Sequence, residues 1–162
     1  MGLALALSAE LTGVTDLHPI DTQEEPYVYS FKVQCTSCRE IHPNFVELTS
    51  WETHDLSGSR GEANFVWRCK SCRRESSASF KSKPQPYTLE DSGKLKNIIE
   101  LETRGLEFLE FKVEGAWSCR SSENEKTKFE EIDLQEGEWF EYDEKAGEEV
   151  MITDIKWEIR RS

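Results

Sequence analysis

Two Cys-x-x-Cys pairs, Cys35 to Cys38 and Cys69 to Cys72, are the residues with the clearest chemistry in this 162-residue chain. A Cys-x-x-Cys turn places both sulfurs on one side of the backbone, about as far apart as two ligands of one Zn²⁺, with Zn–S distances near ~2.3 Å. Two such turns can supply a complete tetrahedral site. We therefore predict one zinc ion per chain, held by Cys35, Cys38, Cys69 and Cys72.

Four cysteine ligands leave no position for water or substrate, which favours a structural over a catalytic zinc. A histidine could replace one sulfur, and the candidates are His42, four residues after Cys38, and His54, between the two pairs. His42 precedes a proline and is expected in a turn, whereas His54 is expected at the surface. His18, which also precedes a proline, is expected in a loop.

Dithiol redox chemistry is the main alternative use of these thiols. Thioredoxin-like enzymes place one Cys-x-x-Cys at the start of a helix in a βαβ unit. Here strand-like sequence precedes both pairs and no helical pattern follows either, which argues against an oxidoreductase. A redox-responsive switch, in which oxidation ejects the zinc, stays open as an alternative. Cys119 is the fifth cysteine and is expected to be a free thiol.

Basic residues surround both pairs, namely Lys32, Arg39, Arg68, Lys70, Arg73 and Arg74. A Zn(Cys)₄ centre carries a formal charge of −2, so nearby cations stabilise its thiolates. The same side chains could instead contact phosphates while Trp67 stacks on a base, so single-stranded nucleic-acid binding is a second alternative. The remainder of the chain disfavours it, because residues 84–162 hold eleven basic and twenty-one acidic residues, a net charge of −10.

Composition indicates a soluble protein. The net charge is −12, 36% of the residues are hydrophobic and 32% are charged. No run approaches the roughly 20 apolar residues of a membrane span. The apolar start, Leu3 to Leu7, is too short for a signal-peptide core and is expected to form a strand. Paired cysteines fit metal binding in a reducing compartment, so we expect a monomer that binds no membrane, in the cytoplasm alone or in both cytoplasm and nucleus.

Strand signals dominate the chain, in runs of branched and aromatic residues separated by turn residues. No segment has a convincing helical period. We predict a mainly β fold with two packed antiparallel sheets in one domain, residues 1–162, with a zinc-bearing segment at about 27–83 and an acidic second half at about 95–160. The expected strands are Leu3–Leu11, Tyr27–Val33, Ala63–Arg68, Ser76–Lys81, Asn97–Thr103, Leu106–Val113, Phe129–Leu134 and Val150–Ile159.

A faint internal repeat suggests that the two halves are related. Glu10–Leu17 resembles Glu102–Leu109, with a glycine followed by a branched residue and then, three residues later, by leucine. Glycine suits the point where a strand bends. A second unusual segment, residues 130–149, is half acidic and contains Trp139, Phe140 and Tyr142. It is either a solvated edge or a docking surface for a basic partner.

The order of these motifs resembles the eukaryotic CXXC-motif-containing zinc-binding protein family over essentially the whole chain. The resemblance rests on the two cysteine pairs, the loop Ser57–Gly61, Arg104–Glu107, Asp133–Trp139 and Tyr142–Lys145. It implies one zinc on the four paired cysteines, a β-rich domain of two sheets and no established enzymatic activity. This chain has Thr103 where some relatives have a further cysteine, a difference outside the predicted zinc ligands.

No catalytic motif is present: the chain has no phosphate-binding glycine loop, nucleophile elbow or His-Glu-x-x-His. We therefore expect a non-enzymatic zinc-binding protein that acts as an interaction or adaptor module with a protein partner. In the loop between the cysteine pairs, Arg60 is expected to bond turn carbonyls or to anchor a partner.

Overall fold

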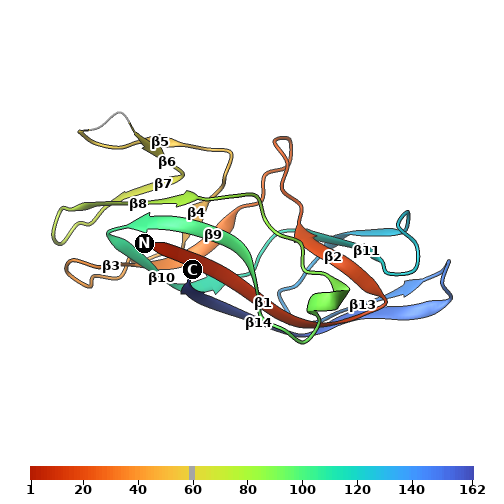
Figure 1. Cartoon of the computed structure of the whole chain (residues 1–162). Coiled ribbons are helices and arrows are strands. Elements are labelled where there is room, and N and C mark those ends of the chain that lie inside the picture. Colours follow the sequence, from red (N-terminus) through yellow and green to blue (C-terminus); the bar gives the residue numbers. More distant parts are fainter. Residues whose placement is uncertain (59–60) are drawn as a thin grey trace.

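A six-stranded antiparallel sheet forms the centre of the molecule. The computed structural model describes residues 1–58 and 61–162. Figure 1 shows the strands at the N and C termini side by side in the middle of this sheet. The strand order is β13 (Trp139–Asp143), β14 (Glu148–Arg161), β1 (Gly2–Thr12), β9 (Lys96–Arg104), β8 (Glu75–Phe80) and β7 (Phe65–Arg68).

Two three-stranded sheets accompany it. One has the order β10 (Leu106–Lys112), β3 (Tyr29–Cys35) and β4 (Val46–Leu48), and the other β12 (Lys128–Ile132), β11 (Trp117–Ser121) and β2 (Val14–Pro19). A small hairpin, β5 (His54–Asp55) with β6 (Glu62–Ala63), lies between the two cysteine pairs in sequence. The mainly β fold of packed antiparallel sheets is confirmed. Arg60, which lies between β5 and β6 in sequence, is outside the described residues.

Helix is almost absent from the described part of the chain, where the only helical element is the 3₁₀ turn Leu89–Asp91. No helix in residues 1–58 and 61–162 has the length and apolar character that a membrane span requires.

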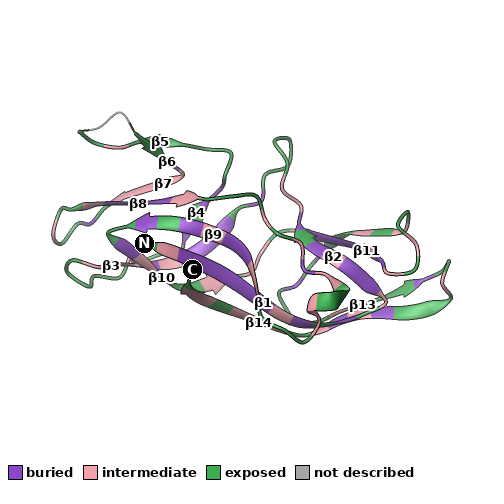
Figure 2. Ribbon diagram, in the orientation of Figure 1, coloured by how far each residue is buried: buried purple, intermediate pink, exposed green. Residues whose placement is uncertain are grey.

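Aromatic side chains fill the space between the small sheets and the large one. Phe111 of β10 and Trp117 of β11 both contact Trp157 of β14, with ring centroids 5.0 and 5.5 Å apart. Tyr29 of β3 lies 5.3 Å from Phe80 of β8. Each three-stranded sheet therefore packs on the six-stranded sheet. Figure 2 shows the result: β1, β9 and β2 are mostly buried, while the β13–β14 end is largely exposed.

The strand order is symmetric about a twofold axis that passes between β1 and β9. Exchanging these two strands also exchanges β14 with β8 and β13 with β7, which leaves the order of the large sheet unchanged. The same operation relates β10-β3-β4 to β2-β11-β12. The two related halves expected from the sequence are therefore confirmed. One strand of each half pairs with strands of the other half. β2 of the first half pairs with β11, and β10 of the second half pairs with β3.

A glycine in the left-handed region marks the same point in both halves. Gly13 (φ +73°) lies between β1 and β2, and Gly105 (φ +77°) lies between β9 and β10. At each glycine the chain leaves the large sheet and enters a small one. A Cβ atom at Gly13 would lie 2.7 Å from Cγ1 of the buried Val150, so this turn is closed to any side chain.

Gly13→Ala is expected to lower the free energy of unfolding by about 2–4 kcal/mol, because it combines left-handed strain with overlap in the core. Gly137→Ala is the matched control: Gly137 has φ +82° but nothing lies within 4 Å of an added Cβ. The control is expected to cost only about 1 kcal/mol. Urea unfolding of both variants measures the difference. Equal losses in the free energy of unfolding would show that overlap with Val150 does not destabilise Gly13→Ala.

Candidate metal centre

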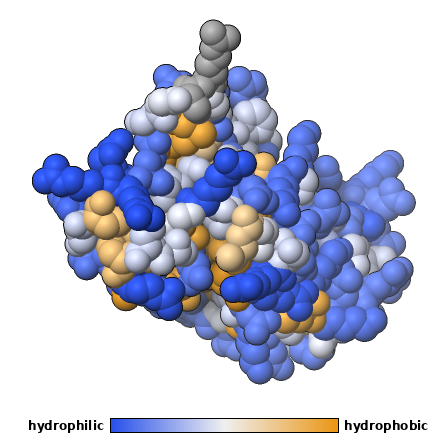
Figure 3. All heavy atoms as spheres, turned by 60° about the vertical axis from the view of Figure 1, so that its left-hand side comes forward, coloured by the Kyte–Doolittle hydropathy of each residue, from blue (hydrophilic) through white to orange (hydrophobic). Residues whose placement is uncertain are grey.

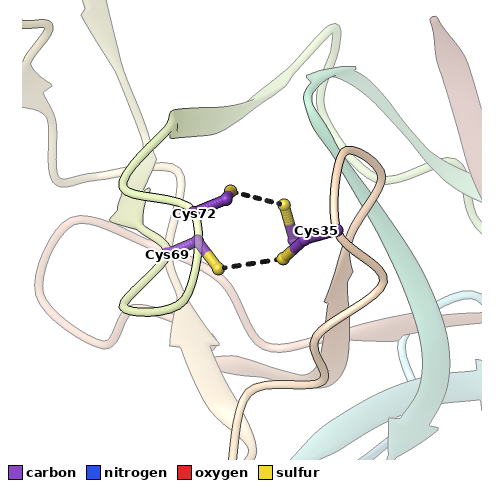
Figure 4. A group of neighbouring side chains, drawn as sticks. Cys35, Cys69 and Cys72 are labelled. Atoms are coloured by element: carbon purple, nitrogen blue, oxygen red, sulfur yellow. Dashed lines mark hydrogen bonds between the residues drawn. The ribbon is translucent and has the colours of Figure 1, made fainter.

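The two cysteine pairs come together from different sheets. Cys35 ends β3 of a three-stranded sheet, while Cys69 directly follows β7 and begins the turn to β8 in the large sheet. In Figure 4 the two turns face each other, and the side chains of Cys35, Cys69 and Cys72 point into the space between them. A metal bound here would join the two sheets at one end of the molecule.

All four sulfurs fit one tetrahedral ion. The Sγ atoms of Cys35, Cys38, Cys69 and Cys72 all lie within 4.8 Å of one another. Cys35 Sγ is 3.6 Å from Cys72 Sγ, and Cys38 Sγ is 3.5 Å from Cys69 Sγ. A tetrahedron with Zn–S bonds of ~2.3 Å has sulfur–sulfur edges of about 3.8 Å, so these distances suit zinc. Cys35 and Cys69 are buried, Cys72 is half-buried and Cys38 is exposed.

Both turns have the same backbone. The residue after each second cysteine, Arg39 or Arg73, has a positive φ of 67° or 63°. Its N–H donates to the carbonyl of the first cysteine, at 2.9 Å for Cys35 and 2.8 Å for Cys69. This left-handed residue curls each turn so that both of its sulfurs lie on one side. Arginine is unusual there, because left-handed backbone favours glycine.

Backbone hydrogen bonds favour the thiolate form of Cys35, one of the clustered cysteines. In the protein without metal, hydrogen bonds from the backbone of Cys38, and further ones from Ser37, lower the pKa of the Cys35 thiol to about 7. The backbone of Glu40 also lowers the pKa of Cys38, but partial loss of hydration at the thiol and the neighbouring sulfurs together outweigh it and raise this pKa. The backbone hydrogen bonds to Cys35 thus favour its thiolate, which is the form that binds a metal cation.

Two of the basic residues around the site support the turns. Arg74 donates from Nη1 to Ser37 Oγ at 3.3 Å, a contact that links the second turn to the first. Arg68 donates from Nη1 to the carbonyl of Arg73 at 2.8 Å. These contacts agree with the structural explanation of the basic residues, in which cations hold the turns and balance the thiolates.

The histidines lie outside the sulfur cluster. His42 packs edge-on against Trp67, with ring centroids 5.5 Å apart, and its Nδ1 lies 3.0 Å from the carbonyl oxygen of Asn44. His54 is on β5 and exposed, as expected. His18 is an exposed residue of β2, so its expected place in a loop is wrong. Cys119 is a free, buried thiol of β11 whose pKa burial raises to about 12.

The second half has the same turns without sulfur, a feature that the sequence did not reveal. Thr36, after Cys35, donates its N–H to Gly105, and Ser122, after Ser121, donates to Gly13, both at 3.0 Å. These equivalent bonds place Ser121 at the position of Cys35. Likewise, the bond from Gly147 to Asp143 at 2.8 Å places Asp143 at the position of Cys69. Hydrogen bonding, first from Ser121, lowers the pKa of the Asp143 carboxyl.

A large surface hollow is separate from the cysteines. It has a volume of about 670 Å³ and lies between the loop after β2 and the segment after β8. Trp51 borders it and donates from Nε1 to Asp21 Oδ1 at 2.7 Å. Figure 3, which brings the cysteine end of the molecule forward, shows apolar side chains there in separate groups among hydrophilic ones.

The family of eukaryotic proteins described as CXXC motif containing zinc binding protein matches residues 4–160 of the chain. A Schizosaccharomyces pombe relative, UPF0587 protein C2D10.03c, is 46% identical over 98% of both chains. A human relative named CXXC motif containing zinc binding protein is 36% identical over 94% of both.

Two solved structures have the same fold as this chain. A crystal structure titled C1orf123 has a TM-score of 0.90 and 35% identity, and the likeness covers 100% of both chains. A hypothetical protein from Plasmodium falciparum has a TM-score of 0.86 over 99% of both chains at 17% identity, and so shares the fold.

Proposed function

Because the chain belongs to the eukaryotic family of CXXC motif containing zinc binding proteins, we propose that its four clustered cysteines hold one structural zinc ion in a non-enzymatic interaction protein. The observation that carries this proposal is the closed sulfur cluster. Cys35, Cys38, Cys69 and Cys72 supply four ligands within 4.8 Å, which completes a tetrahedral shell and leaves no place for substrate or water.

The position of the cluster supports a structural role. It joins the end of β3 to the β7–β8 turn, and Arg74 adds a single hydrogen bond between the two turns. The equivalent turns of the second half use Ser121 and Asp143 instead. The second half thus has a buried serine and a buried carboxylate at the positions where the first half has cysteines, and the metal ligands belong to the first half.

Metal content and thiol reactivity test the zinc site together. Elemental mass spectrometry of the untagged protein is expected to give one zinc per chain. A thiol reagent is expected to find almost no reactive cysteine before chelation, since Cys119 is buried, and four after it. Cys119 should react only in denaturant. Protein that carries no metal and contains one or two disulfides would overturn the structural zinc.

The interaction role is tested in a eukaryotic cytosolic extract by cross-linking mass spectrometry of the zinc-loaded protein. We expect one protein partner, with cross-links that map to a defined surface and a stoichiometric complex after purification of both components. A complex that fails to re-form from the purified components would contradict the role.

The exposure of the Cys38 residue favours a redox-responsive zinc switch as the second candidate. Its Sγ lies 3.5 Å from that of Cys69. Hydrogen peroxide would take two electrons from this pair of thiolates and two protons from solvent, which gives a disulfide and two molecules of water. The two remaining ligands would then release the ion. A switch requires zinc release at micromolar peroxide that dithiothreitol and zinc reverse. Retention of zinc under these conditions would exclude it.

A further inference from the structure

β13 presents an unpaired edge. It ends the six-stranded sheet, and β14 is its only partner among the strands described. The carbonyl of Gly137, two residues before β13, accepts from Ile155 of β14 at 3.3 Å. Because backbone groups alternate along a strand, the N–H and C=O groups of Phe140 and Tyr142 point away from β14. Consistent with this, the Tyr142 N–H donates to a side chain, that of Glu141.

Two large aromatic side chains stand beside this edge. Phe140 is 57% exposed and Tyr142 is 51% exposed, the highest values among the aromatic residues of the described chain. They share one face of β13, since they are two residues apart. Trp139 points to the other face and packs on Phe129 at 5.5 Å. The buried face thus anchors the strand, while Phe140 and Tyr142 contribute nothing comparable to the core.

The charge around the edge is strongly negative and unbalanced. Residues 130–149 contain ten carboxylates and one lysine. None of these carboxylates belongs to the ion pairs found among the described residues. Most are exposed, including Glu138 and Glu141 on either side of Phe140. The edge therefore repels acidic chains and attracts basic ones.

Glu141 adds a selective element. Its Oε1 accepts the Tyr142 N–H at 3.0 Å and so occupies a donor that a neighbouring strand would need. Charged side chains of this kind protect open edges from unwanted pairing. A lysine or arginine on an incoming strand offers the carboxylate a competing partner, which frees the N–H. An apolar or acidic strand offers no such exchange.

We propose that β13 is a docking strand that binds an extended, basic segment of a partner protein as a seventh strand of the large sheet. Backbone groups of Phe140 and Tyr142 would pair with the segment, their rings would contact its alternate side chains, and the surrounding carboxylates would select lysine or arginine. The proposal rests on the interaction role given above and names the surface and chemistry of the partner.

A fluorescein-labelled peptide of four Lys-Val repeats, blocked at both ends, tests the docking strand with the zinc-loaded protein. We expect saturable binding in fluorescence anisotropy that weakens at least roughly tenfold between 50 and 500 mM salt. A Glu-Val peptide should not bind. In NMR, the amides of Phe140 and Tyr142 should shift and exchange more slowly in the complex, because they become hydrogen-bonded.

Matched variants locate the contact. Glu141→Lys is expected to weaken binding about tenfold or more, and Phe140→Ala about fivefold to tenfold. Glu47→Lys on β4 and Trp51→Ala are controls that change an exposed carboxylate and an exposed aromatic in the other half, and each should change affinity less than twofold. Circular dichroism and zinc content should be unchanged in all four variants.

Equal binding by Glu141→Lys and the wild type would overturn the docking strand. So would equal affinity for the Glu-Val peptide, or dimers in sedimentation that Glu141→Lys abolishes, since β13 would then serve a second copy of the chain. None of these results bears on the interaction role itself. That role fails separately, if cross-linking and reconstitution give no stoichiometric partner on any surface.

Discussion

Replacement of Cys69 by serine is expected to abolish zinc binding and to open the cysteine end of the molecule without unfolding the rest. Cys69 is 1% exposed, and its Sγ is 3.5 Å from that of Cys38. Structural zinc contributes ~10–16 kcal/mol in small zinc peptides. In this protein the two cysteine turns would lose the metal that connects them, whereas β1, β9 and β14 would keep their own apolar core.

Hydrogen exchange with mass spectrometry measures this difference along the chain. A local loss of about 3 kcal/mol would speed exchange roughly a hundredfold around residues 35–41 and 65–76. Residues of β1 and β14 should stay protected. Cys119→Ala is the control, because it removes a buried thiol but no ligand, and it should retain one zinc. Faster exchange spread evenly over both halves of Cys69→Ser would contradict a local role for the metal.

Trp117→Ala is expected to cause the largest loss of global stability, about 3–5 kcal/mol in the free energy of unfolding. Trp117 is fully buried where the sheet of β11 packs on the large sheet. Its ring lies 5.6 Å from that of Tyr27 and 5.5 Å from that of Trp157. Nε1 also donates to the Tyr27 hydroxyl at 3.1 Å. Truncation would leave a cavity and remove the donor to the Tyr27 hydroxyl, which would keep only its own hydrogen bond to the Glu114 carbonyl.

The measurement is thermal unfolding followed by circular dichroism, where a shift of roughly 10 °C is expected. Trp117→Phe separates the two contributions, since it keeps most of the ring packing and loses the hydrogen bond, at a cost of about 1–2 kcal/mol. Phe140→Ala, at an exposed position, should change stability by less than about 1 kcal/mol. A loss in Trp117→Ala no larger than this control would show that the interface between the sheets tolerates a cavity.

The strands with continuous apolar character could be predicted from the sequence. Leu3, Leu5 and Leu7 predict β1, and Ile98, Ile99 and Leu101 predict β9, because such residues fit buried strands. β13 and β11 were missed for different reasons. Acidic residues dominate the surroundings of β13, while β11 is five residues long and mostly small or polar. Its burial comes from Trp117, whose neighbours are distant in sequence.

The sulfur cluster was foreseeable because the spacing within each pair fixes its own geometry. That both turns continue with a left-handed arginine was not foreseeable, because that conformation usually indicates glycine. The pairing of β2 and β10 with strands of the opposite half could not be predicted from the sequence either. Pairing partners such as Leu106 and Cys35 are set by packing across the whole chain, and a short repeat of glycine and leucine carries no information on them.

The place of β1 at the centre of the large sheet has a consequence for how the protein is made. β1 is synthesised long before its two partners, β9 and β14, and Leu3 pairs with Arg161. Until then Leu3, Leu5 and Leu7 have no core to enter. Contacts this distant in sequence slow folding and leave strand edges open to aggregation. We therefore expect the apolar side chains of β1 in a nascent chain to need protection until β9 and β14 have been synthesised.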